Sequence, residues 1–365
     1  MNNTKKNDLL FLWTFRWKNQ LSNNKDIVQN QNFNWHDIEI QDDYYFQYSR
    51  ELIKNNFIDK ANFCFFDARF KKEIKEIYPK IFVYIFPSIE SCLKDLEGNY
   101  KLLITRGNFD EFNPLLDTIK KDVSIFYAGY REFIPTYIPI EKFDIIWVDS
   151  LKQLKIGKNK FPNNKWVFLK KTVNSNIFYN DKNIEKKYDI CYPAQHFAPF
   201  KNHELLFSSI SRMKNKKDIT VICPGKYDLK FSLSEVNLWA KMHDINVSFP
   251  GFLSSDDLAQ TMRQSKIGVI PSEKEGNPRI ITEMIACGLP IVANKNLSSG
   301  LDYITSQTGV ASSLDNFTKN LEKLLKNYKK YSPEKYFIKN LSSEKVVKEC
   351  LIDPATEILR NKISI

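Results

Sequence analysis

The stretch from Ile267 to Ala293 is the part of the chain that most constrains its fold. It reads as an apolar strand over 267–270, a polar loop, a helix over 280–287 that ends at Gly288, and a second apolar strand. A strand, a loop, a helix and another strand in this order form the repeating unit of a parallel sheet covered by helices. The stretch therefore predicts an α/β fold.

The loop before this helix carries groups that suit phosphates and hydroxyls. Helix N-termini present N–H groups and a partial positive charge, and both favour phosphate. Gly276 lets a ligand approach the backbone closely, and Pro278 adds a rigid bend before the first helical turn. Glu275 precedes the helix and Glu283 lies one turn into it, where ionised carboxylates accept hydrogen bonds from hydroxyls. The pattern indicates a ligand with phosphates at one end and hydroxyls nearby, such as a nucleotide sugar.

Glu275 and Glu283, with seven residues between them, resemble the E-x7-E signature of GT-B glycosyltransferases. The surrounding EGNPRIITEMIACGLPIVA is similar to glycosyltransferase family 4 and its group 1 relatives. The resemblance implies a GT-B fold, in which two Rossmann-like domains face each other across a cleft. It also implies retaining, metal-independent transfer of a sugar from a nucleoside-diphosphate donor to a hydroxyl acceptor, with Glu275 near the reacting centre and Glu283 on the ribose. The alternative is an ordinary helix N-terminus that carries two acids.

Further residues take donor-binding roles through the same resemblance. Lys201 matches the lysine that binds the donor diphosphate in the family, and the family's arginine position falls on Gln195 or His196. A glutamine or a neutral histidine donates a hydrogen bond without a fixed charge, so Arg279 or Lys226 is a candidate for the missing charge. The loop at Gly225 and Lys226 could equally be a simple connecting turn without a role in binding. With Glu275 and Lys201 as catalytic residues, the expected donor-binding set is Glu283, Gly276, Asn277, Arg279, Ile280, Gln195, His196, Gly225, Lys226, Gly251 and Phe252.

Apolar runs of strand length alternate with helix-length segments in the first half of the chain. Strands are expected at 9–15, 63–66, 81–86, 101–105, 123–127, 143–148 and 166–169, and helices at 70–77 and 113–121. This alternation implies a parallel sheet covered on both faces. Because ligands bind at the carboxyl ends of such strands, Arg106, Gly129, Tyr130 and Asp149 are candidates for the acceptor side. Each also fits a simple turn.

The length of 365 residues accommodates two domains of ordinary size. We expect an N-terminal Rossmann-like acceptor-binding domain at 1–178 and a C-terminal Rossmann-like nucleotide-sugar domain at 179–343. Residues 344–365 are expected to form a helix that returns to the first domain, as the resemblance implies. A UDP- or GDP-linked sugar is the expected co-substrate, with a glycan or lipid-linked acceptor in cell-surface glycan or polysaccharide synthesis, and no further cofactor is expected.

Charge and cysteine usage restrict the partners and the compartment. The net charge is +11, and a lysine-rich stretch at 152–171 has no acidic residue. No nucleic-acid-binding motif accompanies it, so the stretch fits either peripheral contact with an anionic membrane or a solvated face. The six cysteines are scattered and show no metal-ligand spacing. With no apolar run of about 18 residues, these features predict a cytoplasmic protein, at most attached to the inner membrane face, without a metal site.

Two functions other than sugar transfer remain open at this point. The altered position at Gln195 and His196 is compatible with a non-catalytic GT-B subunit that binds a glycan or a partner enzyme. A nucleotide-sugar epimerase has the same fold, but it usually depends on further acidic and histidine residues in the first domain. A phosphorylase would need a lysine for its cofactor, and none is identifiable.

Overall fold

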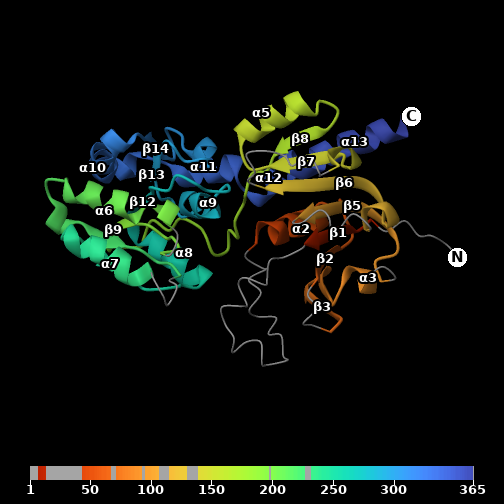
Figure 1. Ribbon diagram of the computed structural model, residues 1–365, viewed down its shortest axis with the longest axis horizontal. Helices are drawn as coiled ribbons and strands as arrows, with labels where there is room; N and C mark the ends of the chain where they lie inside the picture. The colour runs from red at the N-terminus through yellow and green to blue at the C-terminus, as the bar shows by residue number, and fades with distance from the viewer. Residues whose placement is uncertain are drawn as a thin grey trace. The chain divides into compact units, whose positions relative to one another are not determined.

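A computed structural model describes residues 7–13, 43–66, 71–92, 95–106, 115–129, 139–196, 199–226 and 232–364. The chain forms two compact units, each built on its own sheet (Figure 1). The first unit comprises residues up to Lys170 together with Val346–Ile365, and the second comprises Lys171–Lys345. The first boundary therefore lies earlier in the chain than the expected position at residue 178.

An eight-stranded sheet in the order β3-β4-β2-β1-β5-β6-β7-β8 forms the centre of the first unit. Its strands are β1 (Leu9–Trp13), β2 (Ala61–Phe66), β3 (Glu73–Tyr78), β4 (Ile81–Phe86), β5 (Asn99–Arg106), β6 (Lys120–Gly129), β7 (Ile145–Val148) and β8 (Lys165–Phe168). Every pairing is parallel except that of β3 with β4. Alternate residues of β1 enter separate apolar cores on the two faces, which explains why its sequence is apolar throughout.

One prediction for this unit is wrong. A helix was expected over 70–77, but Glu73–Tyr78 is strand β3, which pairs antiparallel with β4 at the edge of the sheet. Its side chains are mostly exposed, so its apolar content does not distinguish a strand from a surface helix. The segment is a strand because it pairs with β4. Without β3, the backbone N–H and C=O groups on that edge of β4 would lack these hydrogen-bond partners.

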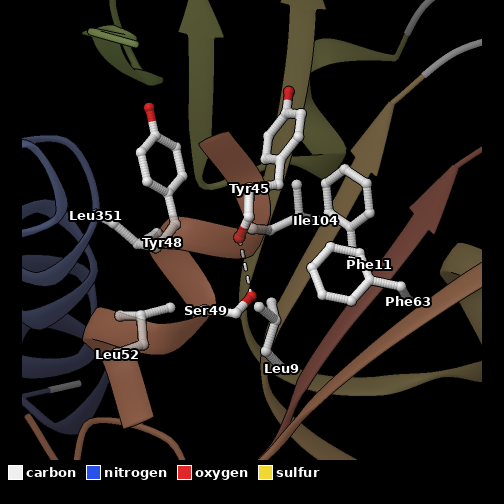
Figure 2. Close-up of a pocket in the computed structure, with 9 residues that line it drawn as sticks. All are labelled: Leu9, Phe11, Tyr45, Tyr48, Ser49, Leu52, Phe63, Ile104 and Leu351. Carbon is white, nitrogen blue, oxygen red and sulfur yellow. Dashed lines mark hydrogen bonds between the residues drawn. The ribbon is translucent and has the colours of Figure 1, made fainter. Parts of the chain in front are cut away.

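Helix α2 (Tyr44–Lys54) covers one face of this sheet, and the end of the chain covers it beside α2. Asp43 caps α2 by accepting a hydrogen bond from the Tyr45 amide at 2.9 Å. Figure 2 shows the α2 residues Tyr45, Tyr48, Ser49 and Leu52 lining a pocket together with residues of β1, β2 and β5. The one hydrogen bond drawn there runs from the Ser49 hydroxyl to the Tyr45 carbonyl, 3.0 Å within the helix itself. This small pocket is lined mainly by packed apolar and aromatic side chains (Leu9, Phe11, Tyr45, Tyr48, Ser49, Leu52, Phe63, Ile104 and Leu351) and belongs to the core.

The end of the chain packs onto the first unit, as the GT-B resemblance implies. Three consecutive helical segments lie there: α12 (Ser343–Val347), a π-helical turn over Lys348–Ile352, and α13 (Asp353–Ile363). In Figure 1, α13 lies alongside the β6–β8 side of the sheet. The Trp147 indole donates to the Cys350 carbonyl at 3.0 Å, and both side chains are buried. This segment completes the core of the first unit.

The second unit contains a six-stranded, wholly parallel sheet in the order β11-β10-β9-β12-β13-β14. Its strands are β9 (Tyr188–Cys191), β10 (Thr220–Ile222), β11 (Asn246–Ser248), β12 (Ser265–Ile270), β13 (Ile291–Asn294) and β14 (Gly309–Ser312). Its helices are α6 (His203–Ser211), α7 (Ser232–Met242), α8 (Ser255–Arg263), α9 (Arg279–Ala286), α10 (Phe317–Asn327) and α11 (Pro333–Asn340). The predicted strand, loop, helix and strand at 267–293 are confirmed as β12, α9 and β13.

The strand order reverses between β9 and β12 in this second sheet. Strands β10 and β11 extend the sheet from β9 in one direction, and β13 and β14 extend it from β12 in the other. Open parallel sheets bind ligands outside the carboxyl ends of their strands at this kind of reversal. The loops that follow β9 and β12 are therefore the first place to look for a site. No helix among the described residues is long and apolar enough to cross a membrane.

Candidate active site

The donor-binding residues expected from the sequence follow the carboxyl ends of four neighbouring strands in the second unit. The order across the sheet is the loop after β11, the loop after β10, the loop after β9 and the loop after β12. These loops carry, respectively, Gly251 and Phe252; Gly225 and Lys226; Gln195, His196 and Lys201; and residues 275–279. The structure thus brings the expected donor set to one edge of one sheet.

Lys201 and Glu275 join the two loops on either side of the strand reversal. The Lys201 ammonium lies 2.5 Å from Glu275 Oε1, and both side chains are largely buried. Tyr192, which directly follows β9, donates from its phenol to the Lys201 carbonyl at 2.5 Å, and its hydroxyl lies 3.3 Å from the Ser272 hydroxyl. The Glu273 amide also donates to the Phe200 carbonyl at 3.3 Å. A cation and a carboxylate are therefore held together where the sheet topology favours a ligand.

Helix α9 begins beside this pair. Its N-cap is Pro278, which offers no side-chain acceptor to the first amides of the helix. Arg279 Nε lies 2.6 Å from Glu283 Oε1 one turn further on, and the Glu283 side chain is only 4% exposed. An uncapped helix N-terminus with an arginine on its first turn is suited to an anion such as phosphate. Both predicted carboxylates thus lie against the predicted cations.

The loop from Glu275 to Pro278 is fixed by the turn that follows β13. The Ser298 hydroxyl accepts from the Glu275 amide at 2.9 Å, and the Ser299 hydroxyl accepts from the Asn277 amide at 3.1 Å. Asn277 is fully buried and has φ 51°, a left-handed conformation that asparagine adopts more readily than most residues. These contacts hold the loop that leads into α9.

The loops after β9, β10 and β11 are connected through their backbones. The Gly225 amide donates to the Gly251 carbonyl at 2.9 Å, and the Ala194 amide donates to the Pro224 carbonyl at 2.9 Å. A Cβ on Gly225 would lie 1.8 Å from the Ala194 carbonyl oxygen, so only glycine fits there. Beside it, the Lys226 ammonium lies 4.3 Å from the centre of the Phe252 ring, a cation–π contact. Gly225 therefore permits close contact between neighbouring loops.

Gln195 and His196 have different surroundings, although the sequence allowed either residue to occupy the family's arginine position. Gln195 is exposed, whereas His196 is buried and its Nε2 lies 3.2 Å from the Cys223 carbonyl. Its ring packs edge-on against His203 and Phe249. Burial lowers the pKa of His196, and burial, together with the neighbouring His196 and Lys201, lowers the pKa of His203 to about 3. His196 is thus a neutral interior residue, and Gln195 is the better placed to meet a ligand.

The acceptor-side candidates lie at the corresponding edge of the first sheet. Arg106 ends β5, and its guanidinium lies 5.4 Å from the Tyr45 ring centre and 5.3 Å from that of Tyr127. The Tyr127 phenol lies 2.8 Å from the carboxylate of Asp149, which is buried at the end of β7. Gly129 has φ 63°, and its carbonyl accepts from the Gln153 side chain. Tyr130 lies outside the described residues.

Lys171 was not selected from the sequence, although it contacts the donor-side loop. Its ammonium donates to the Gly276 carbonyl at 3.0 Å and to the Asn277 carbonyl at 2.7 Å. The one available signal was its position between an apolar strand and Thr172-Val173. No group of three or more potential metal-ligating side chains was found in the part of the chain that the structure describes.

Comparisons with known proteins agree with this geometry. Residues 175–341 match the family model of glycosyl transferases group 1. A glycosyltransferase from Rickettsia africae is 15% identical, with a TM-score of 0.69, and the match covers 98% of this chain and 100% of that chain. A sucrose-phosphate synthase from Thermosynechococcus elongatus is 12% identical, with a TM-score of 0.64 and 98% of both chains covered.

The Anabaena protein HepE, solved with UDP and glucose, is 11% identical with a TM-score of 0.62, and the match covers 98% of this chain and 100% of that chain. No curated protein matches the chain in sequence. The structural matches span both units, and the family match covers the unit that carries the expected donor set. The structural matches therefore show that the chain has the GT-B fold, and residues 175–341 of its second unit match the group 1 glycosyl transferase model.

Proposed function

We propose that the protein transfers a sugar from a nucleoside-diphosphate donor to a hydroxyl group of an acceptor, with retention of anomeric configuration and without a metal ion. The observation that supports this most directly is the pairing of Lys201 with Glu275 and of Arg279 with Glu283 beside the start of α9. Cations and a helix N-terminus suit the diphosphate, and carboxylates suit sugar and ribose hydroxyls. The family match to this unit supports sugar transfer as the reaction.

The ion pairs suggest how donor binding would rearrange the site. A diphosphate carries more negative charge than one carboxylate, so it would compete with Glu275 for Lys201 and with Glu283 for Arg279. Each carboxylate would then be available to accept from hydroxyls, Glu283 from the ribose and Glu275 from the transferred sugar. In this proposal donor entry exchanges partners within the site instead of introducing unpaired charges.

The chemical step needs stabilisation of the leaving group. The bond between the anomeric carbon and the phosphate oxygen breaks, the acceptor oxygen bonds to that carbon, and the acceptor proton passes to the leaving phosphate oxygen. Charge grows on the diphosphate as the bond breaks, and Lys201, Arg279 and the N-terminus of α9 are placed to stabilise it. The interior position of His196 gives that ring no part in this step.

We propose UDP as the first nucleotide to test. Several structural neighbours were solved with UDP, including HepE with glucose and the pneumococcal O-GlcNAc transferase GtfA with GlcNAc. Another neighbour is a galactosyltransferase of the lipopolysaccharide outer core. These names support a UDP-linked hexose donor and a cell-surface glycan as the acceptor class.

We also propose that α5 (Leu151–Lys160) brings the protein to an anionic membrane at the cytoplasmic face. Its outer surface carries four exposed lysines, and Leu151 and Ile156 are 49% and 43% exposed among them. Basic side chains beside exposed aliphatic ones suit a surface of anionic lipid headgroups.

Co-sedimentation with phosphatidylglycerol vesicles tests this part. The wild type should sediment with the vesicles, and replacing Lys152, Lys155 and Lys158 by Glu should abolish the binding. Equal binding of the wild type to neutral phosphatidylcholine vesicles would refute the proposed membrane contact.

Donor turnover is the experiment that tests the main proposal. UDP-, GDP- and ADP-linked sugars are incubated with the wild type and with Glu275→Ala, Lys201→Ala and Glu283→Ala, and release of nucleoside diphosphate is followed with and without EDTA. We expect slow hydrolysis of one donor, insensitive to EDTA and lost in the variants, with NMR showing the retained anomer of the transferred sugar. Failure to bind or turn over any donor would favour a non-catalytic subunit. An epimerised donor would favour an epimerase.

A further inference from the structure

Lys171 is the first residue of the second unit, and its side chain extends to a loop more than a hundred positions along the chain. The residue is only 6% exposed. Its ammonium donates to the carbonyls of Gly276 and Asn277, at 3.0 Å and 2.7 Å. Its own amide donates to the phenol of Tyr303, which is buried. Both its backbone and its side chain are thereby fixed within the second unit.

The two carbonyls that Lys171 binds belong to the residues that place the start of α9. Asn277 is buried in a left-handed conformation, which asparagine adopts more readily than most residues, and its peptide groups also have hydrogen-bond partners. The Ser299 hydroxyl accepts from the Asn277 amide on one side, and Lys171 donates to the Asn277 carbonyl on the other. The loop is therefore held at its amides by the turn after β13 and at its carbonyls by Lys171.

The Lys171 ammonium donates to both carbonyls and, unlike a neutral donor, places a positive charge beside the loop. Hydrogen bonds from a charged donor are stronger than neutral ones, and a buried charge stays effective over several ångströms. The same charge lies near the start of a helix whose partial charge is already positive. Lys171 thus does two things: it fixes the backbone of the loop and adds to the positive potential there.

We propose that Lys171 is a positioning residue of the donor site, which acts through the carbonyls of Gly276 and Asn277 on the loop that would hold the diphosphate. The part that concerns the donor rests on the proposed function, whereas the effect on the loop does not. Neither the family match, which begins at residue 175, nor the expected donor set includes Lys171. The proposal assigns it no contact with the substrate.

Lys186 provides a matched control. It too is a partly buried lysine of the second unit, and its ammonium donates to the backbone carbonyl of Arg263 at 2.6 Å. Burial lowers the pKa of Lys186. Arg263 ends α8, before β12 begins. Lys186→Met therefore removes a lysine–carbonyl contact of the same kind without touching the loop after β12.

The experiment compares Lys171→Met, Lys171→Arg and Lys186→Met in the full chain, with amide hydrogen exchange as the first readout. We expect the amides of residues 274–281 to exchange at least about tenfold faster in Lys171→Met than in the wild type, because the loop loses charge-assisted bonds. Lys171→Arg should restore most of the protection, and Lys186→Met should leave this loop unchanged. Equal exchange in the wild type and Lys171→Met would overturn the proposal.

Titration with UDP is the second readout. Lys171→Met is expected to weaken UDP binding about tenfold or more relative to Lys186→Met of matched stability, and Lys171→Arg should recover part of the loss. A wild type that binds no nucleotide would refute the proposed function, while the exchange result would still decide the role of Lys171 in the loop. Faster loop exchange with unchanged UDP affinity would overturn the positioning role.

Discussion

Single residues of the loops after β9 and β12 would carry the proposed chemistry, and Lys201 is the most important of them. Its ammonium is paired with Glu275 and lies at the point where the strand order of the second sheet reverses. The sequence identified both residues through their similarity to a known motif. It could not show that they face each other, because 74 positions separate them and only the parallel pairing of β9 with β12 brings their loops together.

Lys201→Met should lower the rate of donor turnover about 10²–10³-fold, the usual effect of losing one group that stabilises a developing negative charge. The measurement is the rate of nucleoside-diphosphate release at saturating donor. Lys266→Met is the control, because Lys266 makes a comparable ion pair with Asp189, 2.7 Å, at the start of β12 and away from the carboxyl edge. Similar losses in the two variants would contradict a specific role for Lys201.

His203 should make stability depend on pH. Its pKa in the folded protein is about 3, whereas an exposed histidine titrates near ~6.5. The unfolded chain therefore takes up a proton first, so the stability from neutral His203 is present above pH ~6.5 and is lost at about 1.4 kcal/mol per pH unit as the pH falls towards 3. Urea unfolding of the wild type and His203→Phe should show free energies that converge or cross as the pH is lowered.

Phe207→Leu is the control for this titration, since it alters the same apolar surroundings without removing a titratable group. Its free energy of unfolding should run parallel to that of the wild type across the pH range. A difference between wild type and His203→Phe that does not change with pH would contradict the assignment of a neutral, buried imidazole.

At the scale of elements, the sequence predicted the strands that are buried in a parallel sheet, because burial sets their apolar pattern. Strand β12 is apolar from Ile267 to Ile270 and β13 from Ile291 to Ala293, because both faces of the sheet are covered. Helix α9 between them ends at Ala286, and Gly288 follows it with φ 76°. The edge strand β3 was mistaken for a helix, because its exposed side chains leave only its pairing with β4 to define it. The contact of Lys171 with Gly276 was unpredictable for a related reason: it depends on tertiary packing between distant segments.

Helix α5 offers a test of packing between elements. A Cβ on Gly157 would lie 2.3 Å from the Trp166 ring of β8, and that ring is buried and bonded through its indole to the Phe161 carbonyl. Gly157→Ala should therefore lower the free energy of unfolding by about 1–3 kcal/mol, despite the higher helix propensity of alanine. Lys158→Ala, on the exposed side of α5, should change it by less than about 0.5 kcal/mol. Chemical denaturation measures both, and a Gly157→Ala variant of wild-type stability would contradict this packing.

At the scale of the whole molecule, the end of the chain belongs to the unit in which the chain begins. Val346, Val347, Cys350, Leu351 and Ala355 are all buried in the core of the first unit. The sequence predicted this return through its resemblance to GT-B proteins. It did not locate the acceptor side, because the candidate Arg106 is packed among tyrosines and Tyr130 lies outside the described residues.

A chain that ends at residue 345 should lose cooperative unfolding of the first unit, because removal of the segment exposes an apolar core face and leaves the Trp147 indole without the Cys350 carbonyl. Limited proteolysis should then cut within residues 43–170 much faster than in the full chain. A chain that ends at residue 360 keeps the buried residues and should resist as the full chain does. Equal resistance of the chain ending at 345 would contradict the assignment of this segment to the first core.

We propose that the carboxyl edge of the second sheet binds a nucleoside diphosphate between the loops after β9 and β12. Calorimetric titration of UDP, GDP and ADP into the full chain measures this binding. We expect one of these nucleotides to bind, with an affinity that falls at least about tenfold in Lys201→Met and Glu283→Ala but not in Lys266→Met. Absence of binding by all three, or equal affinity in all four proteins, would contradict it.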